Sequence, residues 1–433
     1  MQKGLYFYIN CLIFLVTVFL TAPLFSHASE NPLFLGYSRR YLIYLILYTT
    51  PVLVFLWLIL RRDPVFNRNL CLIVLTTFLL SEAVARILMS SKAYQDEEYR
   101  YAKPYVMFSG KPNVEFVDNG ALMGATQSDD RMIRLNEFGF RGEIPPAKKT
   151  PQEYRIFMLG GSTVFNGAPL SRTIAGQVEE LFHQKGMKNV KVYNWGVVSY
   201  VSGQELSLLL HTVVNYEPDA VIVYDGANDI YQPYYYDPRP GYPYNFLIVE
   251  VGLSRIENRA SIIELVSSIL YKSKALALIY RSSLQDQIAP IGRIRQEIGN
   301  FRSEEWEKDI VNVYEGNLKK MCRLAEAYDF KAAFILQPMI HFKTPLVGHE
   351  AQFDREDAFR SYLVRQFGRA RDGLVQVKGR LSSDRCVTAD LSGVFKNDER
   401  ELFWDMVHIN NDGNAVVAGE IYNVLESAGF GKK

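Results

Sequence analysis

Two short stretches of the sequence carry residues that together could hydrolyse an ester. Ser162 lies in a Gly-Gly-Ser-Thr turn after a short apolar run, and Asp405 and His408 stand far downstream, three residues apart. A serine hydroxyl is a weak nucleophile at neutral pH and needs a base, which in turn needs an orienting acid. Since an acid and an imidazole at this spacing can point the same way from a turn, we predict a catalytic triad of Ser162, His408 and Asp405.

The reaction also needs hydrogen-bond donors where the carbonyl oxygen becomes negative, each worth on the order of 3 kcal/mol. We predict three: the backbone N–H of Ser162, the backbone N–H of Gly196 and the side-chain amide of Asn228. Each follows a different expected strand, and the ends of neighbouring parallel strands lie close enough to converge on one atom. We expect Asp229 to support the loop that holds Asn228.

The elements that must position these residues alternate regularly from residue 154 onward. Apolar runs typical of strands cover 155–159, 190–193, 220–224, 332–336 and 384–390, and helical spacing covers 173–185, 202–216, 304–328 and 412–428. We expect Ser202 to cap the second helix and Pro218 to stop it. Near-continuous apolar strands that alternate with amphipathic helices predict a parallel sheet covered on both faces. Ligands of such folds bind at the carboxyl edge, where the candidate residues lie.

Three apolar runs dominate the N-terminal part of the chain, at residues 5–25, 41–60 and 70–88. Each is close to the ~20 residues that cross a bilayer. The alternative is a set of buried core helices, but three such runs separated by short polar loops favour membrane insertion. The first run can also be read as a signal peptide. With either interpretation, the positive-inside rule predicts that the C-terminal part of the chain is extracytoplasmic. Glu82 and Arg86, four apart in the third run, can pair on one helix face.

Four blocks of the sequence resemble those of the SGNH hydrolases, also called GDSL esterases. They are Gly-Gly-Ser-Thr at Ser162, Asn-Trp-Gly at Gly196, Gly-Ala-Asn-Asp at Asn228, and the Asp-x-x-His that ends at His408. They occur in the family's order, and the similarity covers about residues 150–430. One departure is Gly161, because the family's more familiar residue before the serine is an acid.

The resemblance implies a three-layer α/β/α sandwich around a parallel, flavodoxin-like, five-stranded sheet. It also implies ester chemistry on acylated substrates without a metal or cofactor. The segment 136–142 resembles the one that precedes this domain in membrane-anchored bacterial members, many of which act on acylated polysaccharides. We therefore expect a transmembrane region at 1–90, a connector at 91–150 and a hydrolase-like domain at 151–430.

An insertion is expected at about 230–300, where the alternation is interrupted. It begins with a Tyr/Pro-rich stretch, 231–238, which should not continue a helix, and a helical pattern follows over 248–284. Aromatic residues beside an active edge could stack on sugar rings or line an acyl pocket. The alternative is a self-packed lid, or an insertion that lies against the membrane.

Other chemistry finds little support. The formal net charge is +1, so a nucleic-acid partner has no electrostatic basis. The chain has no CxxC, no HExxH and no acidic calcium loop, which argues against a metal. A Gly-Gly-Ser turn could bind phosphate, but neither GxGxxG nor a Walker lysine accompanies it. Cys322 and Cys386 lie in the soluble part, and their spacing alone does not establish a disulfide.

The sequence therefore predicts a membrane-anchored serine esterase of the bacterial inner membrane, with its catalytic domain outside the cytoplasm. Its expected substrate is an acylated glycan or lipid of the cell envelope, most simply an O-acetylated carbohydrate, and envelope polysaccharide assembly would supply its partners. One alternative is an O-acyltransferase, which would share every residue. Another is a non-catalytic carbohydrate-binding or scaffolding protein, against which the presence of all five chemical residues argues.

Overall fold

The structure is a computed structural model that describes residues 64–90, 100–117, 132–250, 292–355, 357–380 and 384–432, with scattered positions before residue 64 and at 273 and 275. The chain divides into two compact units, residues 1–92 with 247–294 and residues 93–246 with 295–433. Most of the first two apolar runs and most of the helical pattern expected over 248–284 lie outside the described residues.

The described part of the first unit is dominated by helix α3 (Pro64–Ser90). Within it, Arg68–Ile87 is long and apolar enough to cross a membrane, with a mean hydropathy of 2.0. It is the one such helix in the described ranges, and it qualifies by length and composition alone. The expected pair between Glu82 and Arg86 is present at 2.8 Å, and the same carboxylate accepts a hydrogen bond from the Ser273 hydroxyl at 2.7 Å.

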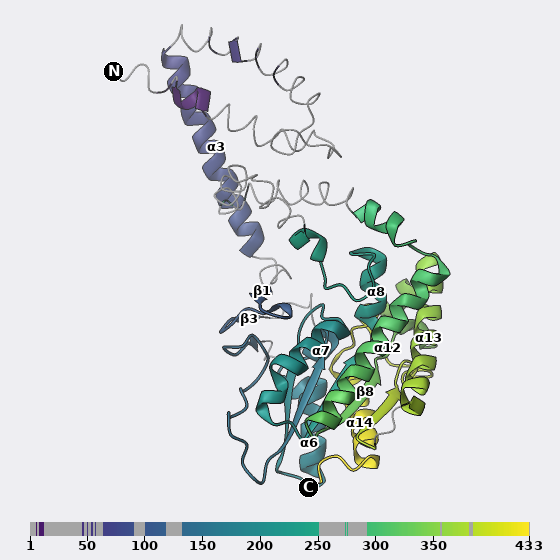
Figure 1. The fold of residues 1–433 in the computed structure, drawn as a ribbon. Helices are drawn as coiled ribbons and strands as arrows, with labels where there is room; N and C mark the ends of the chain where they lie inside the picture. Colours follow the sequence, from purple (N-terminus) through teal and green to yellow (C-terminus); the bar gives the residue numbers. More distant parts are fainter. Residues whose placement is uncertain are drawn as a thin grey trace. The chain divides into compact units, whose positions relative to one another are not determined.

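A parallel sheet of five strands forms the centre of the second unit (Figure 1). Its order is β6-β5-β7-β8-β9, and the strands are β5 (Tyr154–Gly160), β6 (Val190–Gly196), β7 (Ala220–Asp225), β8 (Lys331–Leu336) and β9 (Cys386–Asp390). This confirms the predicted α/β class and its flavodoxin-like strand order. In the register, Gly160 lies opposite both Gly196 and Tyr224, so three candidate blocks begin at one edge.

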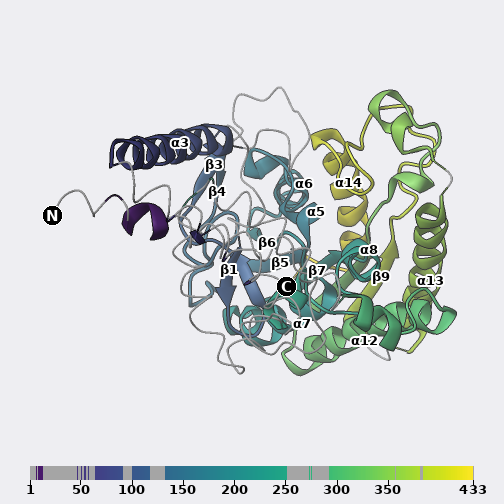
Figure 2. The same ribbon diagram turned by 90° about the horizontal axis from the view of Figure 1, so that it is seen from above.

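Helices cover both faces of the sheet because successive side chains of a strand point to opposite faces. Ile156, Met158 and their neighbours pack with α6 (Ile174–Gln184) and α14 (Asn411–Ser427). Phe157, Leu159 and their neighbours pack in a second core with α7 (Ser202–His211), α12 (Glu304–Ala327) and α13 (Ala358–Arg380). Figure 2 shows α6 and α14 together on one side and α7, α12 and α13 on the other, which completes the three layers.

Two small antiparallel sheets precede the parallel sheet in the chain. They pair β1 (Arg100–Lys103) with β2 (Met107–Gly110), and β3 (Glu115–Val117) with β4 (Met132–Arg134). Phe108 is buried in the core shared with α7 and α12, and its carbonyl accepts a hydrogen bond from the Tyr200 hydroxyl at 2.6 Å. Strands of three or four residues are too short to show periodicity, which explains why this segment looked like a connector.

The structure corrects two local predictions. Helix α8 (Ala227–Tyr235) continues through Pro233 into the Tyr/Pro-rich stretch, where we expected no helix. Pro233 removes one backbone donor, and the helix ends two residues later, so the loss is small. Ser202 is the first residue of α7 and does not cap it, because its hydroxyl donates to Asp229 at 2.5 Å. That helix also ends at His211, before a separate 3₁₀ turn.

Candidate active site

Ser162 is held at the carboxyl end of the fully buried strand β5. The strand ends at Gly160, and Ser162 begins a four-residue helix, α5 (Ser162–Phe165). A strand that turns directly into a short helix leaves its first helical N–H groups without intrahelical partners. The Ser162 side chain is partly exposed, while the three residues that follow it are buried. The nucleophile candidate is therefore a solvent-accessible group on a fixed backbone.

Asp405 and His408 lie on a tight loop closed by backbone contacts on either side. Phe403 pairs with Ile409 as an antiparallel bridge, and the Asp405 Oδ1 atom accepts hydrogen bonds from the backbone N–H groups of Val407 at 2.9 Å and His408 at 2.7 Å. The second carboxylate oxygen, Asp405 Oδ2, is therefore available to the imidazole of His408 and lies 2.6 Å from its Nδ1 atom. One carboxylate thus shapes the loop and orients the ring.

The structure brings all three predicted triad residues together. His408 Nε2 lies 2.7 Å from Ser162 Oγ, across 246 residues of sequence. Burial alone would raise the pKa of Asp405, but the charge of His408 and the hydrogen bonds to its side chain and backbone outweigh burial and lower it. An ionised carboxylate can only accept a hydrogen bond. His408 Nδ1 therefore carries the ring proton, and Nε2 is the acceptor for the Ser162 hydroxyl.

Two side chains outside the predicted set join these loops. Asn166, just after α5, donates from Nδ2 to the Ile409 carbonyl at 2.6 Å and so links the Ser162 turn to the His408 loop. Arg141, from the 136–142 segment, is 2% exposed and donates to the carbonyls of Phe165 and Gly167. Neither side chain could be recognised from sequence, because both act through backbone carbonyls distant in the chain.

Asn228 lies where its side chain can reach the Ser162 backbone. It belongs to the first turn of α8, and its Nδ2 donates one proton to the Tyr200 carbonyl at 2.8 Å, which leaves the second amide proton. A Cβ atom on Gly161 would stand 2.4 Å from that nitrogen. The lack of a side chain at Gly161 therefore leaves room for the Asn228 amide at the start of α5.

Gly196 does not offer the free donor that we predicted. It is buried, and its N–H donates to the Asn194 side-chain oxygen at 3.2 Å. Three residues on, Ser199 has a left-handed φ of 66°. Its hydroxyl accepts from Arg100 at 2.9 Å and its carbonyl accepts from Gln232 at 2.8 Å, while its N–H has no partner among the described residues. Ser199 directly precedes Tyr200, to which Asn228 bonds, and is the stronger candidate donor.

Three acidic side chains are buried behind the Asn228 loop. Glu205, Asp225 and Asp229 are each at most 2% exposed, and burial is the largest cause of their raised pKa values. Asp229 accepts from the backbone N–H of Ser202 at 2.9 Å and from its hydroxyl, which ties the start of α8 to the start of α7. This is the supporting contact expected of Asp229. Within the described ranges, no group of histidine, cysteine and acidic residues is arranged to hold a metal.

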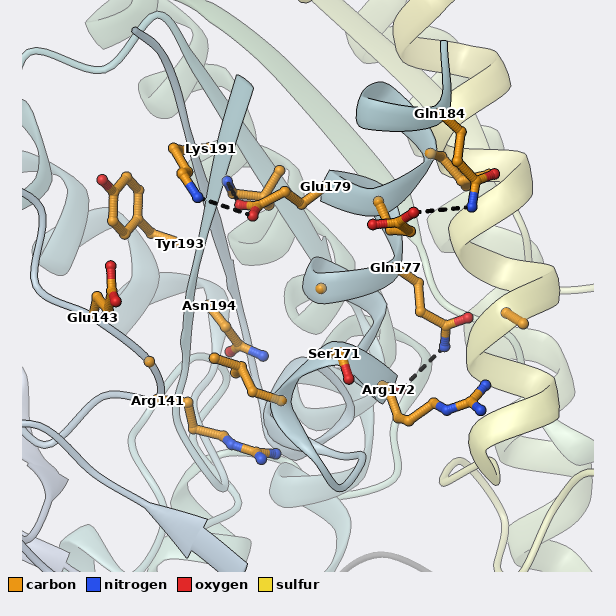
Figure 3. A pocket seen from close by; sticks show the side chains of 17 residues that line it. Arg141, Glu143, Ser171, Arg172, Gln177, Glu179, Gln184, Lys191, Tyr193 and Asn194 are labelled. Carbon is orange, nitrogen blue, oxygen red and sulfur yellow. Dashed lines mark hydrogen bonds and ion pairs between the residues drawn. The ribbon is translucent and has the colours of Figure 1, made fainter. Parts of the chain in front are cut away.

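A cavity of about 780 Å³ lies along α6 and the edge strand β6 (Figure 3). Two of its charged lining residues form an ion pair: Lys191 lies 3.4 Å from Glu179, whose second oxygen accepts from the Val192 N–H at 2.7 Å. The bond to Val192 occupies a backbone donor on the edge strand. None of the triad residues lines this cavity.

No protein-family model matches the chain, and no curated protein matches its sequence. Three solved structures are similar to this chain, each at 12% sequence identity. An acetyl xylan esterase has a TM-score of 0.37, and the similarity covers 62% of this chain and 98% of that one. For the acetylxylan esterase Axe2 from Geobacillus stearothermophilus the TM-score is 0.36, with 65% of this chain and 96% of that one covered, and for a GDSL-like lipase from Bacteroides thetaiotaomicron it is 0.35, with 65% and 93% covered. Because this structural similarity is low, any argument for an activity must come from the geometry of the site itself.

The parallel sheet places the predicted residues after its strands in the order expected from the sequence. The serine follows β5, the chain's first strand in the parallel sheet, and the acid-x-x-His follows β9, its last. The asparagine follows β7, between β5 and β8. The three triad residues thus meet at one edge of the sheet, and the Asn228 amide lies beside Gly161.

Proposed function

We propose that this chain is a serine esterase that removes acyl groups, most simply acetyl groups, from an O-acylated carbohydrate. The observation that carries the proposal is the continuous contact from Asp405 through His408 to Ser162, at 2.6 and 2.7 Å. Such an arrangement activates a hydroxyl that is otherwise unreactive at neutral pH.

In the proposed reaction, Ser162 Oγ attacks the acyl carbonyl carbon while its proton passes to His408 Nε2. Asp405 stabilises the resulting imidazolium. The oxyanion accepts hydrogen bonds from the N–H of Ser162, the amide of Asn228 and the N–H of Ser199. Collapse of this intermediate breaks the ester bond, and the alcohol leaves with the proton from His408. Water then attacks the acyl-enzyme with the same help and releases the carboxylic acid.

The accessibility of the triad supports a bulky alcohol partner. The side chains of His408 and Asp405 are 17% and 35% exposed, so solvent reaches both partners of this contact. The oxygen that leaves with the His408 proton can therefore belong to a large molecule, such as a sugar within a chain. Only the acyl group has to fit between Ser162 and the donors.

Ester hydrolysis by the full-length protein in detergent is the direct test. We expect release of acetate from a chromogenic acetyl ester and labelling of Ser162 by a fluorophosphonate. Ser162→Ala should lose both, whereas Ser171→Ala, which removes an exposed hydroxyl on the 3₁₀ turn after α5, should keep both. If the wild type is inert to ester and fluorophosphonate alike, the protein is not a serine esterase.

We further propose that the protein is anchored in the membrane and that this reaction occurs outside the cytoplasm. The apolar span Arg68–Ile87 supports the anchor. A disulfide between Cys322 on α12 and Cys386 at the start of β9 supports the compartment, because disulfides persist in oxidising surroundings. A fusion of alkaline phosphatase to the C-terminus should be active in cells. If the fusion is inactive, and if Cys322 and Cys386 are free thiols that react with maleimide, the unit that carries the candidate active site lies in the cytoplasm.

A further inference from the structure

The aromatic residues of α8 and α13 are arranged in two layers. The inner layer is fixed: Tyr362 is 2% exposed, its hydroxyl donates to the Ile230 carbonyl at 2.8 Å, and its ring packs on Tyr234 and Trp306 with centroids 4.8 and 5.7 Å apart. The outer layer consists of Tyr231, Tyr235 and Phe359, which we call the aromatic ledge. The inner rings hold α8 against α13, so the aromatic ledge stands on a rigid support.

Close ring contacts make the aromatic ledge one surface. The ring centroids of Tyr231 and Tyr235 lie 4.9 Å apart, and Phe359 meets them at 5.7 and 4.7 Å, in both cases nearly edge-on. Tyr235 nevertheless remains 52% exposed. An exposed tyrosine held in place by neighbouring rings loses little conformational freedom when a ligand packs on it.

The aromatic ledge continues directly from the candidate catalytic site. Asn228, Tyr231 and Tyr235 are spaced by three and four residues in α8, so they lie along one face of that helix. Burial and then nearby charges, that of Asp405 among them, raise the pKa of Tyr231, so its phenol lies within electrostatic reach of the triad. A molecule whose acyl group is bound at Ser162 and Asn228 could therefore extend along this face.

We propose that the aromatic ledge is a sugar-binding subsite, on which a pyranose ring of the acylated glycan stacks beside the scissile ester. This assignment rests on the proposed esterase function and adds the residues that select its substrate. A pyranose has an apolar C–H face and a polar rim, and tyrosine matches it with an apolar ring and a hydroxyl. A long acyl chain would instead need an enclosed apolar groove, whereas Tyr235 is open to water and the charge of Asp357 reaches its phenol.

The test compares Tyr235→Ala with Tyr328→Ala in the full-length protein. Tyr328 is a matched control, since it is 51% exposed but lies at the end of α12, just before β8 begins and thus at the opposite edge of the sheet. The substrates are a panel of O-acetylated tetrasaccharides derived from xylan, mannan and chitin, with p-nitrophenyl acetate and p-nitrophenyl octanoate as esters that carry no sugar.

For at least one tetrasaccharide, we expect kcat/KM of Tyr235→Ala to fall roughly tenfold, as is typical when an aromatic anchor is truncated. Hydrolysis of p-nitrophenyl acetate should stay unchanged, and so should every rate of Tyr328→Ala. Tyr235→Phe, which keeps the ring, should retain most of the sugar-dependent rate.

Three results would overturn the subsite while leaving the esterase intact. The first is that Tyr235→Ala hydrolyses the tetrasaccharides as fast as wild type does. The second is that Tyr235→Ala loses as much activity on p-nitrophenyl acetate as on the tetrasaccharides. The third is that it loses activity only on p-nitrophenyl octanoate, which would assign the aromatic ledge to an acyl chain. Failure of the proposed function looks different, because the wild type would then hydrolyse none of these esters.

Discussion

Gly161→Ala offers a sharp test of how the candidate site holds its oxyanion donors. The new Cβ atom would stand 2.4 Å from Asn228 Nδ2, closer than any stable contact between such atoms, and 3.4 Å from the Tyr200 carbonyl oxygen. The atom that must move is the end of a side chain, so the fold can absorb the change. The φ of Gly161 is −84°, so an alanine there would not have to adopt a left-handed backbone conformation.

The expected loss is therefore catalytic. Displacing one oxyanion donor costs on the order of 3 kcal/mol, or roughly 10²- to 10³-fold in kcat. We expect Gly161→Ala to lower kcat for p-nitrophenyl acetate by about that factor, with a small change in thermal stability. Gly316→Ala is the control, because its Cβ would meet nothing within 4 Å in the middle of α12. That variant should keep full activity and gain a little stability.

A double-mutant cycle decides whether the effect passes through Asn228. Asn228→Ala alone should lose about as much activity as Gly161→Ala, and the two changes together should lose little more, because both remove the same donor. Fully additive losses would show that Gly161 acts elsewhere, and an unchanged kcat in Gly161→Ala would refute the assignment of Asn228 as a donor.

Two further predictions concern stability. Cys322→Ser should destabilise the protein by up to about 4 kcal/mol, which is the value that the chain-entropy model gives for a sequence separation of 64 residues. Dithiothreitol should lower the unfolding midpoint of the wild type to that of the variant and leave the midpoint of the variant unchanged. Burial, and then Glu205 and Asp229, raise the pKa of Asp225, so the folded state keeps a proton that the unfolded chain releases above about pH 4. The Asp225 carboxyl should thus make wild-type stability fall as the pH rises above about 4, and Asp225→Asn, which needs no proton, should show a smaller fall. Equal pH dependences of the urea unfolding free energy would contradict this.

The parts of the fold that could be predicted are those governed by local pattern. The strands β5, β6 and β7 are apolar runs that end in glycine or polar residues, and both the sheet and the meeting of Ser162 with His408 follow from placing those ends at one edge. Helix α13 is not predicted, because its sequence is on average more polar than those of the helices α6, α7, α12 and α14.

The unpredicted features of the site depend on contacts that are distant in sequence. Gly196 resembles a donor in its block, yet only three-dimensional geometry shows that its N–H is bonded to Asn194. The same geometry shows the left-handed Ser199 three residues later, whose N–H has no partner in the part of the chain that the structure describes. The same holds for Asn166, whose partner Ile409 is 243 residues away. No local signal in the sequence marks such pairs.

The separation of Ser162 from His408 also affects when the site can first react. During synthesis the N-terminal part of a chain emerges and folds first. Ser162 is made 246 residues before its base, and the loop of His408 is joined to the serine turn only once Asn166 can bond to Ile409. A chain cut short before β9 would therefore carry an inert alcohol. The proposed enzyme would thus be inactive as a nascent chain and become active only when the loop that carries His408 packs against the serine turn.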